Sequence, residues 1–222
     1  MQRRYRRYEE VPMELWSNDF SDGDPIPGEY AFCLPDAVTH ATFGPNRNPH
    51  LAWSGTPHGT RSLAIVCHDP DVPTKSDDVN VEGREVPEDL PRTDFFHWVL
   101  LELSHEVTEI GTAACSDGVT ARGKGNESPF DCRQGVNDYT AWFAGDRDME
   151  GSYHGYDGPC PPWNDSVIHH YVFTVFALDS GSFELPEGFG GADARSAMEG
   201  HVLDSATLTG TYTLNPRLSP VS

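Results

Sequence analysis

The apolar residues of the chain occur in short runs separated by turns rich in glycine and proline. The three strongest runs span residues 62–67, 94–103 and 171–178, and the last follows a pair of histidines, His169 and His170. These runs are rich in β-branched and aromatic residues and are apolar on both faces, which is typical of strands at the centre of a sheet. Weaker runs predict shorter strands at 13–16, 27–32, 51–53, 139–143 and 203–214.

One segment has the character of a helix. Residues 192–199 are rich in alanine, and Gly200 stands where a C-terminal cap belongs. Many short strands, with one or two short helices including one near the C-terminus, predict a mainly β fold, an antiparallel β sandwich. Because sandwiches of this length commonly form one domain, we expect a single domain over residues 11–222, with a long surface excursion at about 111–155.

The charge balance narrows the classes of partner. The chain has 35 Asp and Glu against 15 Lys and Arg, a formal net charge of −20, and its two lysines are Lys75 and Lys124. Nucleic acids and anionic membranes require a basic surface, so we expect no nucleic-acid partner. An acid excess with so little lysine predicts a halophilic protein, because a Debye length of about 3 Å in molar salt screens the repulsion. An acidic mesophilic protein is the alternative.

Residues 1–10 are the basic part of the chain, with arginines at positions 3, 4, 6 and 7. We expect a disordered tail, and a contact arm for a partner is the alternative. These residues lack the apolar segment of a signal peptide, and no apolar run approaches the roughly 18 residues of a membrane span. We therefore expect no stable membrane insertion and a cytoplasmic location.

The cysteines give a weak signal. Their number is odd and none form a C-x-x-C pair, which indicates neither a disulfide framework nor a zinc ribbon and favours a reducing compartment. Cys115 and Cys132 could pair, but their spacing leaves this open. The five cysteines are Cys33, Cys67, Cys115, Cys132 and Cys160.

Polar side chains gather at the ends of the three strongest strands. Residues at strand ends of one sheet can converge on a common pocket, and a rigid proline loop at 158–162 would form one wall of it. Because strand side chains alternate, His170 should face away from the side that His169 faces. The candidates are His68, Asp69 and Asp71 after the first strand, His97 in the second, and His169, His170 and Tyr171 at the start of the third.

Such a pocket would suit an anion. Imidazole N–H groups of His97 and His169 could both donate to a phosphate or carboxylate oxygen. Asp69 or Asp71, accepting from the far ring nitrogen, would fix the tautomer and favour the charged form. Because the surface is acidic, affinity must come from close hydrogen bonds, at about 1.5 to 3 kcal/mol each when one partner is charged.

Four motifs together resemble the phosphatidylethanolamine-binding protein family, in its bacterial and archaeal branch of Raf kinase inhibitor-like (YbhB/YbcL-type) proteins. In the order of the chain they are Asp69-Pro70-Asp71-Val72-Pro73, Phe96-His97-Trp98, Tyr156-Asp157-Gly158-Pro159-Cys160-Pro161-Pro162 and His169-His170-Tyr171-Val172-Phe173. Val72 departs from the usual Ala, and no Tyr shortly precedes His97 as it does in animal relatives.

The resemblance implies a β sandwich that binds a phospholipid headgroup or another small anionic or phosphorylated ligand, without cofactor or metal. It also implies a role in modulating signalling, with a kinase or protease as protein partner. The anion pocket that it implies consists of Asp69, Asp71, His97, Pro161, Pro162, His169 and Tyr171.

Two alternatives compete with a binding module. The first is a regulator that binds a kinase or protease through surface loops and keeps a vestigial pocket. The second is a metal-dependent hydrolase, but no H-x-H or H-E-x-x-H spacing occurs. Cys160 near His169 has no evident oxyanion hole or orienting acid, so we expect no enzyme. The hydrolase would draw its ligands from Cys67, His68, Asp69, Asp71, His97, Cys160 and His169.

Overall fold

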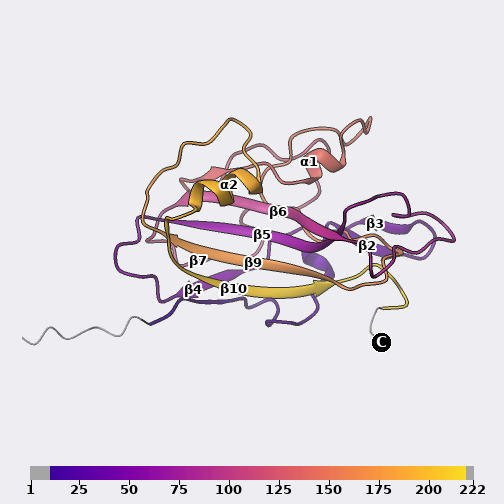
Figure 1. Ribbon diagram of the computed structural model, residues 1–222, viewed down its shortest axis with the longest axis horizontal. Coiled ribbons are helices and arrows are strands. Elements are labelled where there is room, and N and C mark those ends of the chain that lie inside the picture. Colours follow the sequence, from indigo (N-terminus) through magenta and orange to yellow (C-terminus); the bar gives the residue numbers. More distant parts are fainter. Residues whose placement is uncertain (1–10, 219–222) are drawn as a thin grey trace, which may run out of the picture.

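A twisted antiparallel sheet of five strands forms the centre of the computed structural model, which describes residues 11–218 (Figure 1). The tail predicted for residues 1–10 lies outside the described residues. Along the sheet the order is β10-β9-β5-β6-β8. The bounds are β5 Ser62–Pro73, β6 Arg92–Leu103, β8 Arg133–Gln134, β9 His169–Leu178 and β10 Val202–Tyr212.

A smaller sheet packs on one face of the large one and completes the sandwich. It has the order β1-β4-β7, with β1 Glu14–Trp16, β4 Leu51–Ser54 and β7 Glu109–Ile110. Side chains from both sheets, including Trp53 from β4 and Ile65 and Phe173 from the large sheet, share one buried cluster. The mainly β sandwich predicted from the sequence is therefore confirmed.

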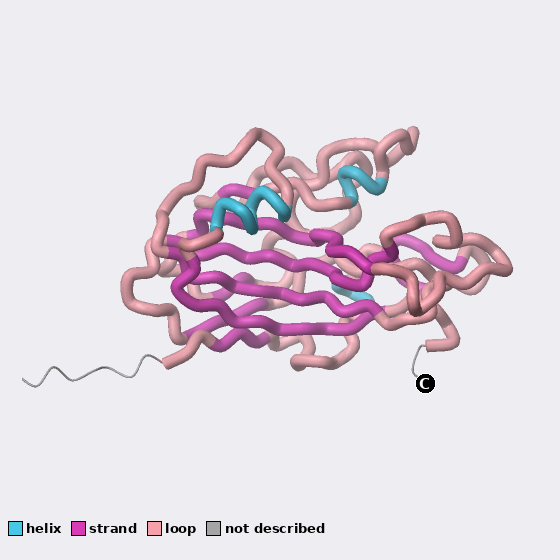
Figure 2. The backbone as a smooth tube through the Cα atoms, in the orientation of Figure 1, coloured by secondary structure: helices cyan, strands magenta, loops and turns pink. Residues whose placement is uncertain are grey.

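Helix α2, Gly191–Met198, covers the other face of the large sheet (Figure 2). Its Ala194 and Met198 belong to a second buried cluster with Val66 of β5 and Leu101 of β6. At Gly191 an added Cβ would come within 2.1 Å of the Phe96 ring, so glycine permits the close approach of this helix to β6. Burial on both faces explains why the central strands lack polar alternation.

Two predicted strands are helical turns. Residues 139–143 contain α1, Tyr139–Trp142, and residues 27–32 contain a 3₁₀ helix, η1, Gly28–Tyr30. The Tyr139 and Phe143 rings stack with centroids 5.7 Å apart, as residues four apart on a helix do. This apolar pair fits a helix as well as a strand, and the sequence prediction chose wrongly. Cys33–Asp36 and His40–Phe43 form a separate hairpin, β2 and β3.

Strand β5 continues beyond the apolar run 62–67 that predicted it and includes Pro70. Its pairing with β9 ends at His68, and only β6 pairs with it further on. Pro70 therefore lies where one side of the strand needs no ladder hydrogen bond, a position that proline tolerates. Register shifts interrupt the pairing with β6 between Cys67 and His68 and between Asp69 and Val72.

The excursion at 111–155 is not wholly on the surface. Besides loops it contains β8 and α1, and its Asn137 and Tyr153 are buried. Within residues 11–218, neither α-helix has the length and apolar character that crossing a bilayer requires.

One disulfide joins Cys33 at the start of β2 to Cys160 in the proline loop. Cys115 and Cys132, the pair left open by the sequence, are free thiols, as is Cys67. The bridged cysteines are 127 residues apart in the chain, so no local spacing announces them.

Candidate ligand-binding site

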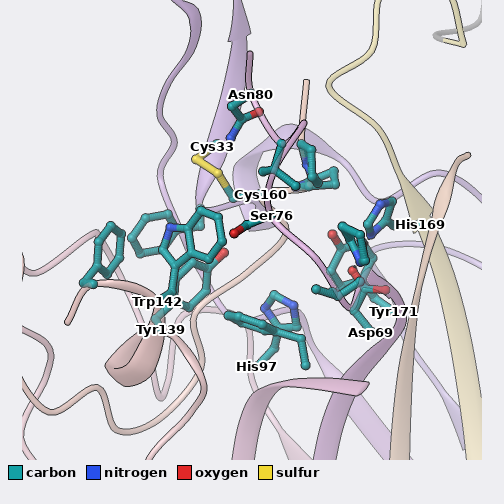
Figure 3. Close-up of a pocket in the computed structure, with 18 of the residues that line it drawn as sticks. Cys33, Asp69, Ser76, Asn80, His97, Tyr139, Trp142, Cys160, His169 and Tyr171 are labelled. Atoms are coloured by element: carbon teal, nitrogen blue, oxygen red, sulfur yellow. Dashed lines mark hydrogen bonds and ion pairs between the residues drawn. A yellow bond between two sulfur atoms is a disulfide. The ribbon is translucent and has the colours of Figure 1, made fainter. Parts of the chain in front are cut away.

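A cavity of about 190 Å³ lies at one end of the large sheet (Figure 3). Residues of β5, β6 and β9 border it on one side, and the proline loop, the β2–β3 hairpin and α1 border it on the other. Because neighbouring strands are antiparallel, the end of β5 lies beside the starts of β6 and β9. Its lining includes polar groups from these strands and an apolar wall from the loops. The main lining residues are Phe43, Asp69, Ser76, Asn80, His97, Tyr139, Trp142, Phe143, Cys160, Pro161, Pro162, His169 and Tyr171.

Of the seven residues of the implied anion pocket, all except Asp71 line this cavity, whereas the further candidates His68 and His170 do not. The Asp71 carboxylate lies 2.8 Å from Nδ1 of His170 and accepts a hydrogen bond from the His170 backbone N–H at 2.9 Å. A regular strand would place Asp69 and Asp71 on the same face, but the register shift after Asp69 breaks the alternation. His170 is exposed whereas His169 is buried, in agreement with the alternation expected along β9.

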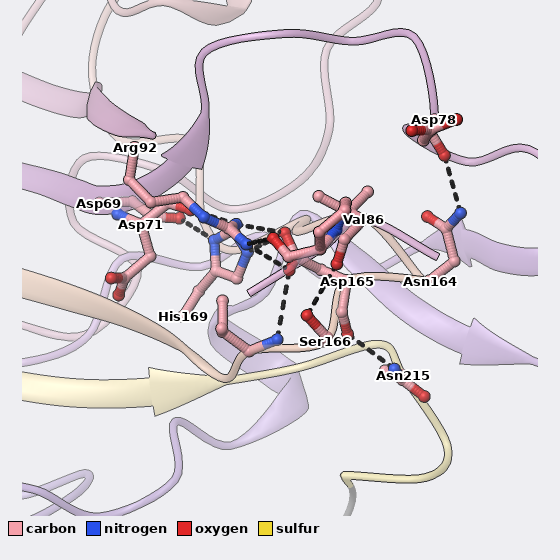
Figure 4. A network of polar contacts seen from close by, with 12 residues as sticks. Asp69, Asp71, Asp78, Val86, Arg92, Asn164, Asp165, Ser166, His169 and Asn215 are labelled. Atoms are coloured by element: carbon pink, nitrogen blue, oxygen red, sulfur yellow. Dashed lines mark hydrogen bonds and ion pairs between the residues drawn. The ribbon is translucent and has the colours of Figure 1, made fainter. Parts of the chain in front are cut away.

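His169 lies between two carboxylates. Its Nδ1 is 2.7 Å from Oδ2 of Asp69, and its Nε2 is 3.1 Å from Oδ2 of Asp165 (Figure 4). Burial by itself would lower the pKa of His169, but hydrogen bonds to Asp165 and Asp69 raise it to about 9. The imidazolium therefore uses both N–H groups within the protein, and it cannot also donate to a ligand in this arrangement. Both ring nitrogens, which the sequence analysis considered as donors to an anion or partners of Asp69 or Asp71, face Asp69 and Asp165.

Arg92 completes this network. Its guanidinium binds both carboxylate oxygens of Asp165, with N–O distances of 2.6 and 3.0 Å. Burial favours a raised pKa for Asp165, but His169 and Arg92 outweigh it and lower the pKa of this carboxyl. Two anions, Asp69 and Asp165, thus offset two cations. The sequence analysis missed Arg92 and Asp165; the spacing of Asp165 four residues before His169 was the available signal.

His97 has the opposite character. Its Nδ1 lies 2.7 Å from the backbone oxygen of Asp157, and its side chain is buried. Burial outweighs the influence of Asp69 and lowers the pKa of His97 to about 4. At neutral pH the imidazole is uncharged. Because a carbonyl can only accept, Nδ1 carries the proton and Nε2 offers a lone pair.

Tyr171 supplies a hydroxyl group that makes no well-formed hydrogen bond. The oxygen is buried at the cavity, and among the described residues the Asp69 carboxylate is near enough to interact with it, but outside hydrogen-bond geometry. Burial, reinforced by the nearby Asp69 carboxylate, raises the pKa of Tyr171 well above its usual value. The phenol therefore stays protonated and remains able to donate.

A second buried network supports His97 from behind. The Asp157 carboxylate lies 2.5 Å from Nζ of Lys124 and accepts hydrogen bonds from the side-chain amides of Asn46 and Asn137 at 2.7 and 2.8 Å. Burial raises the pKa of Asp157 despite these partners. The network fixes the loop whose carbonyl orients His97. One of the two lysines of the chain thus serves a buried carboxylate, which no sequence motif indicated.

Paired cations set the electrostatics of the site. Arg92 and His169 are matched by Asp165 and Asp69, and Lys124 is matched by Asp157. The polar end of the cavity therefore has no surplus positive charge at neutral pH. Within residues 11–218, no three His, Cys, Asp or Glu side chains are arranged to hold a metal ion, so no described cluster supports the hydrolase alternative.

Comparison with protein families places these features in context. Residues 16–213 match the family model described as "Phosphatidylethanolamine-binding protein". The chain is 30% identical to the UPF0098 protein YbhB of Escherichia coli, with 90% of this chain and 99% of that protein covered. It is 32% identical to a UPF0098 protein of Methanothermobacter thermautotrophicus, with 90% of this chain and 98% of that protein covered.

Solved structures agree with the sequence comparison. The crystal structure of E. coli YbcL, described as a new member of the mammalian PEBP family, matches with a TM-score of 0.66 at 26% identity, covering 91% of this chain and 99% of that one. A phosphatidylethanolamine-binding protein homologue from Chlamydia trachomatis matches with a TM-score of 0.61 at 27% identity, covering 90% and 97%.

Proposed function

This chain belongs to the phosphatidylethanolamine-binding protein family, and from that premise we propose that it is a binding module for a small phosphorylated or otherwise anionic ligand. The ligand head would lie at the polar end of the cavity, between His97 and Tyr171, with Asp69 holding His169 beside it. Pro161 and Pro162 form part of the surrounding wall. The residues serve recognition, and we propose no catalytic step.

The buried Tyr171 hydroxyl is the observation that supports this proposal most strongly. A buried donor without an acceptor costs about 1 to 3 kcal/mol, and an oxygen of a bound ligand would remove that cost. At neutral pH His97 presents a lone pair at Nε2, which would accept a hydrogen bond from a protonated ligand head. It would donate to an anion only where that anion raises the pKa of His97 from about 4, and Nδ1 keeps its bond to Asp157 in both cases. Since the neighbouring cations are already paired, affinity would come from these short contacts, with little help from long-range attraction.

A histidine-detected NMR titration tests the proposal. Phosphate, phosphoethanolamine and acetate are added in turn at high salt, and the resonances of His97 are followed. We expect His97 to respond to at least one of them. A lack of response to all three would contradict the proposed function.

A matched pair of tyrosine variants sharpens this test. Tyr171→Phe removes only the hydroxyl group of Tyr171. It should reduce the affinity for the ligand that responds in the titration by roughly tenfold, which corresponds to the loss of one charge-assisted hydrogen bond. Tyr212→Phe is the control, because its hydroxyl already donates to the Cys33 carbonyl at 2.8 Å and Tyr212 does not line the cavity. Equal losses in both variants would argue against a ligand contact at Tyr171.

We further propose a cytoplasmic site of action in a salt-rich cell, on the basis of the acid excess. The Cys33–Cys160 disulfide is the feature that counts against it, since reducing compartments rarely maintain such bonds. Cell fractionation tests the proposal, with thiols trapped by acid and then alkylated under denaturing conditions, because Cys67 is buried in the folded protein. Cytoplasmic protein with five labelled cysteines fits a reducing interior, whereas three labelled cysteines indicate an intact disulfide.

A further inference from the structure

We propose that the outer half of the cavity is a subsite for an aromatic ring, so that the ligand is an aryl-bearing molecule with its polar head at His97 and Tyr171. Inorganic phosphate and free phosphoethanolamine would fill only the inner half. The position of the head rests on the proposed function, whereas the ring subsite rests on the aromatic residues at the mouth of the cavity.

Exposed aromatic side chains gather at this mouth. Among the described residues, three Phe or Trp side chains are strongly exposed, and two of them, Phe43 at 56% and Trp142 at 50%, line the cavity. They come from separate segments, the end of β3 and the end of α1. Figure 3 shows Trp142 on the side of the cavity opposite Asp69, His169 and Tyr171. A ligand whose head reached Tyr171 would therefore extend toward the indole.

Phe43 and helix α1, whose last residue is Trp142, are held in place before any ligand arrives. Phe32 stacks on Tyr139 with centroids 4.4 Å apart and meets Phe43 edge-on at 5.6 Å. The Tyr139 hydroxyl donates to the Gly158 carbonyl at 2.8 Å, which ties α1 to the proline loop. The Cys33–Cys160 disulfide fixes that loop to β2. A preformed wall of this kind spares the ligand the ordering cost that a mobile loop would impose.

The volume of the cavity suits a single aromatic ring. A dry protein cavity of roughly 150 Å³ accommodates benzene. This cavity, at about 190 Å³, has room for one ring and a small polar head. Aromatic rings favour offset-stacked or edge-on contacts with other rings, and Trp142, Phe143 and Phe43 all line the cavity. The chemical class that fits is a monocyclic aryl group joined to a hydrogen-bonding head.

Calorimetric titration at high salt tests the subsite with three probes: phenyl phosphate, hexyl phosphate and inorganic phosphate. We expect phenyl phosphate to bind at least tenfold more tightly than inorganic phosphate and more tightly than hexyl phosphate. Equal affinity for phenyl and inorganic phosphate would overturn the subsite. Equal affinity for phenyl and hexyl phosphate would overturn its preference for an aromatic ring.

Two tryptophan variants locate the effect. Trp142→Ala should reduce the advantage of phenyl over inorganic phosphate to within about threefold, because it removes the exposed indole from the cavity wall. Trp16→Ala is the matched control, since Trp16 is 42% exposed but lies on β1 of the smaller sheet, away from the cavity. If Trp142→Ala still binds phenyl phosphate at least tenfold more tightly than inorganic phosphate, the assignment of the ring subsite to Trp142 would be overturned.

Benzyl alcohol separates failure of the subsite from failure of the proposed function. It presents the ring and a neutral head without an anion. If no phosphate binds but benzyl alcohol does so in a Trp142-dependent manner, the anion function fails and the ring subsite stands. If neither phenyl phosphate nor benzyl alcohol binds, the subsite is overturned.

Discussion

His97 and His169 lie on two strands that border the same cavity, yet the protein holds their imidazoles in opposite charge states. Burial dominates at His97 and lowers its pKa to about 4. At His169 the hydrogen bonds to Asp165 and Asp69 overcome burial and raise the pKa to about 9. The difference follows from partners: His97 faces a neutral backbone carbonyl, whereas both nitrogens of His169 face carboxylates.

The two histidines should therefore limit stability on opposite sides of neutral pH. The ordinary pKa of histidine is about 6.5. The contribution of charged His169 to the free energy of unfolding is fully present below that pH and is lost as the pH rises through about 9. The free energy of unfolding should fall by about 3 kcal/mol over this range. Neutral His97 favours folding above pH 6.5, and this advantage is lost as the pH falls toward about 4.

Urea unfolding between pH 4 and 10 at fixed high salt measures this profile, and NMR titration assigns the two pKa values. We expect His97→Gln to reduce the loss of stability between pH 6.5 and 4 (the acid limb of the profile). The loss of stability as the pH rises toward 9 (the alkaline limb) should not change. His58→Gln, which alters an exposed histidine in the loop between β4 and β5, is the control. A folded-state pKa near 6.5 for either buried histidine would contradict the assignment.

Lys124 makes a second prediction at the scale of one residue. Lys124→Met leaves the Asp157 carboxylate buried beside two amides but without its cation. Removing one partner of a buried ion pair destabilises by about 3 to 5 kcal/mol, and the loss should shrink at low pH because Asp157 can then be protonated. Lys75→Met is the control, since Lys75 is exposed. Chemical denaturation of both variants measures the difference, and equal stabilities would count against a structural role for Lys124.

At the scale of elements, the parts that form the cavity differ in how visible they were in the sequence. β5, β6 and β9 could be predicted because both of their faces are buried, one by the smaller sheet and one by α2. α1 could not, because Tyr139 and Phe143 suit a helix or a strand, and tertiary contacts decided between them.

The residues of the site also differ in how far the sequence alone could predict them. Asp69 and His169 stood at the ends of predicted strands, and His97 interrupted an apolar run, so a pattern could find all three. Arg92, Lys124 and Asp165 lie in or beside loops, and their roles arise only when the chain brings distant segments together. Asp71 was assigned wrongly because strand alternation does not reveal the register shift that follows Asp69.

The disulfide is the element-scale feature with the clearest energetic consequence. It closes a chain segment between residues 127 positions apart, and a loop of that length predicts stabilisation of about 5 kcal/mol, mainly through restriction of the unfolded chain. We expect the Cys33→Ser, Cys160→Ser double variant to lose about this amount in urea unfolding. Reduction of the wild-type protein should have the same effect. Cys115→Ser, which removes a free thiol, is the control.

At the scale of the whole molecule, the net charge of −20 is the property that local structure does not explain. Arg92 and Lys124, two of the basic residues that could offset it, are committed to buried carboxylates at the cavity. Much of the remaining acid lies on exposed loops, as at Asp77, Glu88 and Asp89 between β5 and β6. Repulsion among such groups opposes the compact state unless salt screens it.

Stability should therefore rise with salt. At about 1 M ionic strength the Debye length falls to roughly 3 Å, so repulsion between exposed carboxylates is nearly removed, whereas buried pairs such as His169 with Asp69 are screened far less. We expect the melting temperature to increase steadily from 0.1 to 3 M KCl. A triple variant, Asp77→Asn with Glu88→Gln and Asp89→Asn, reduces the net charge from −20 to −17 and should depend less on salt. Because the general effect of salt on apolar burial acts equally on both proteins, a smaller slope in the variant isolates charge repulsion. Identical slopes, or a melting temperature that does not rise with KCl, would show that the acid excess is not an adaptation to molar salt.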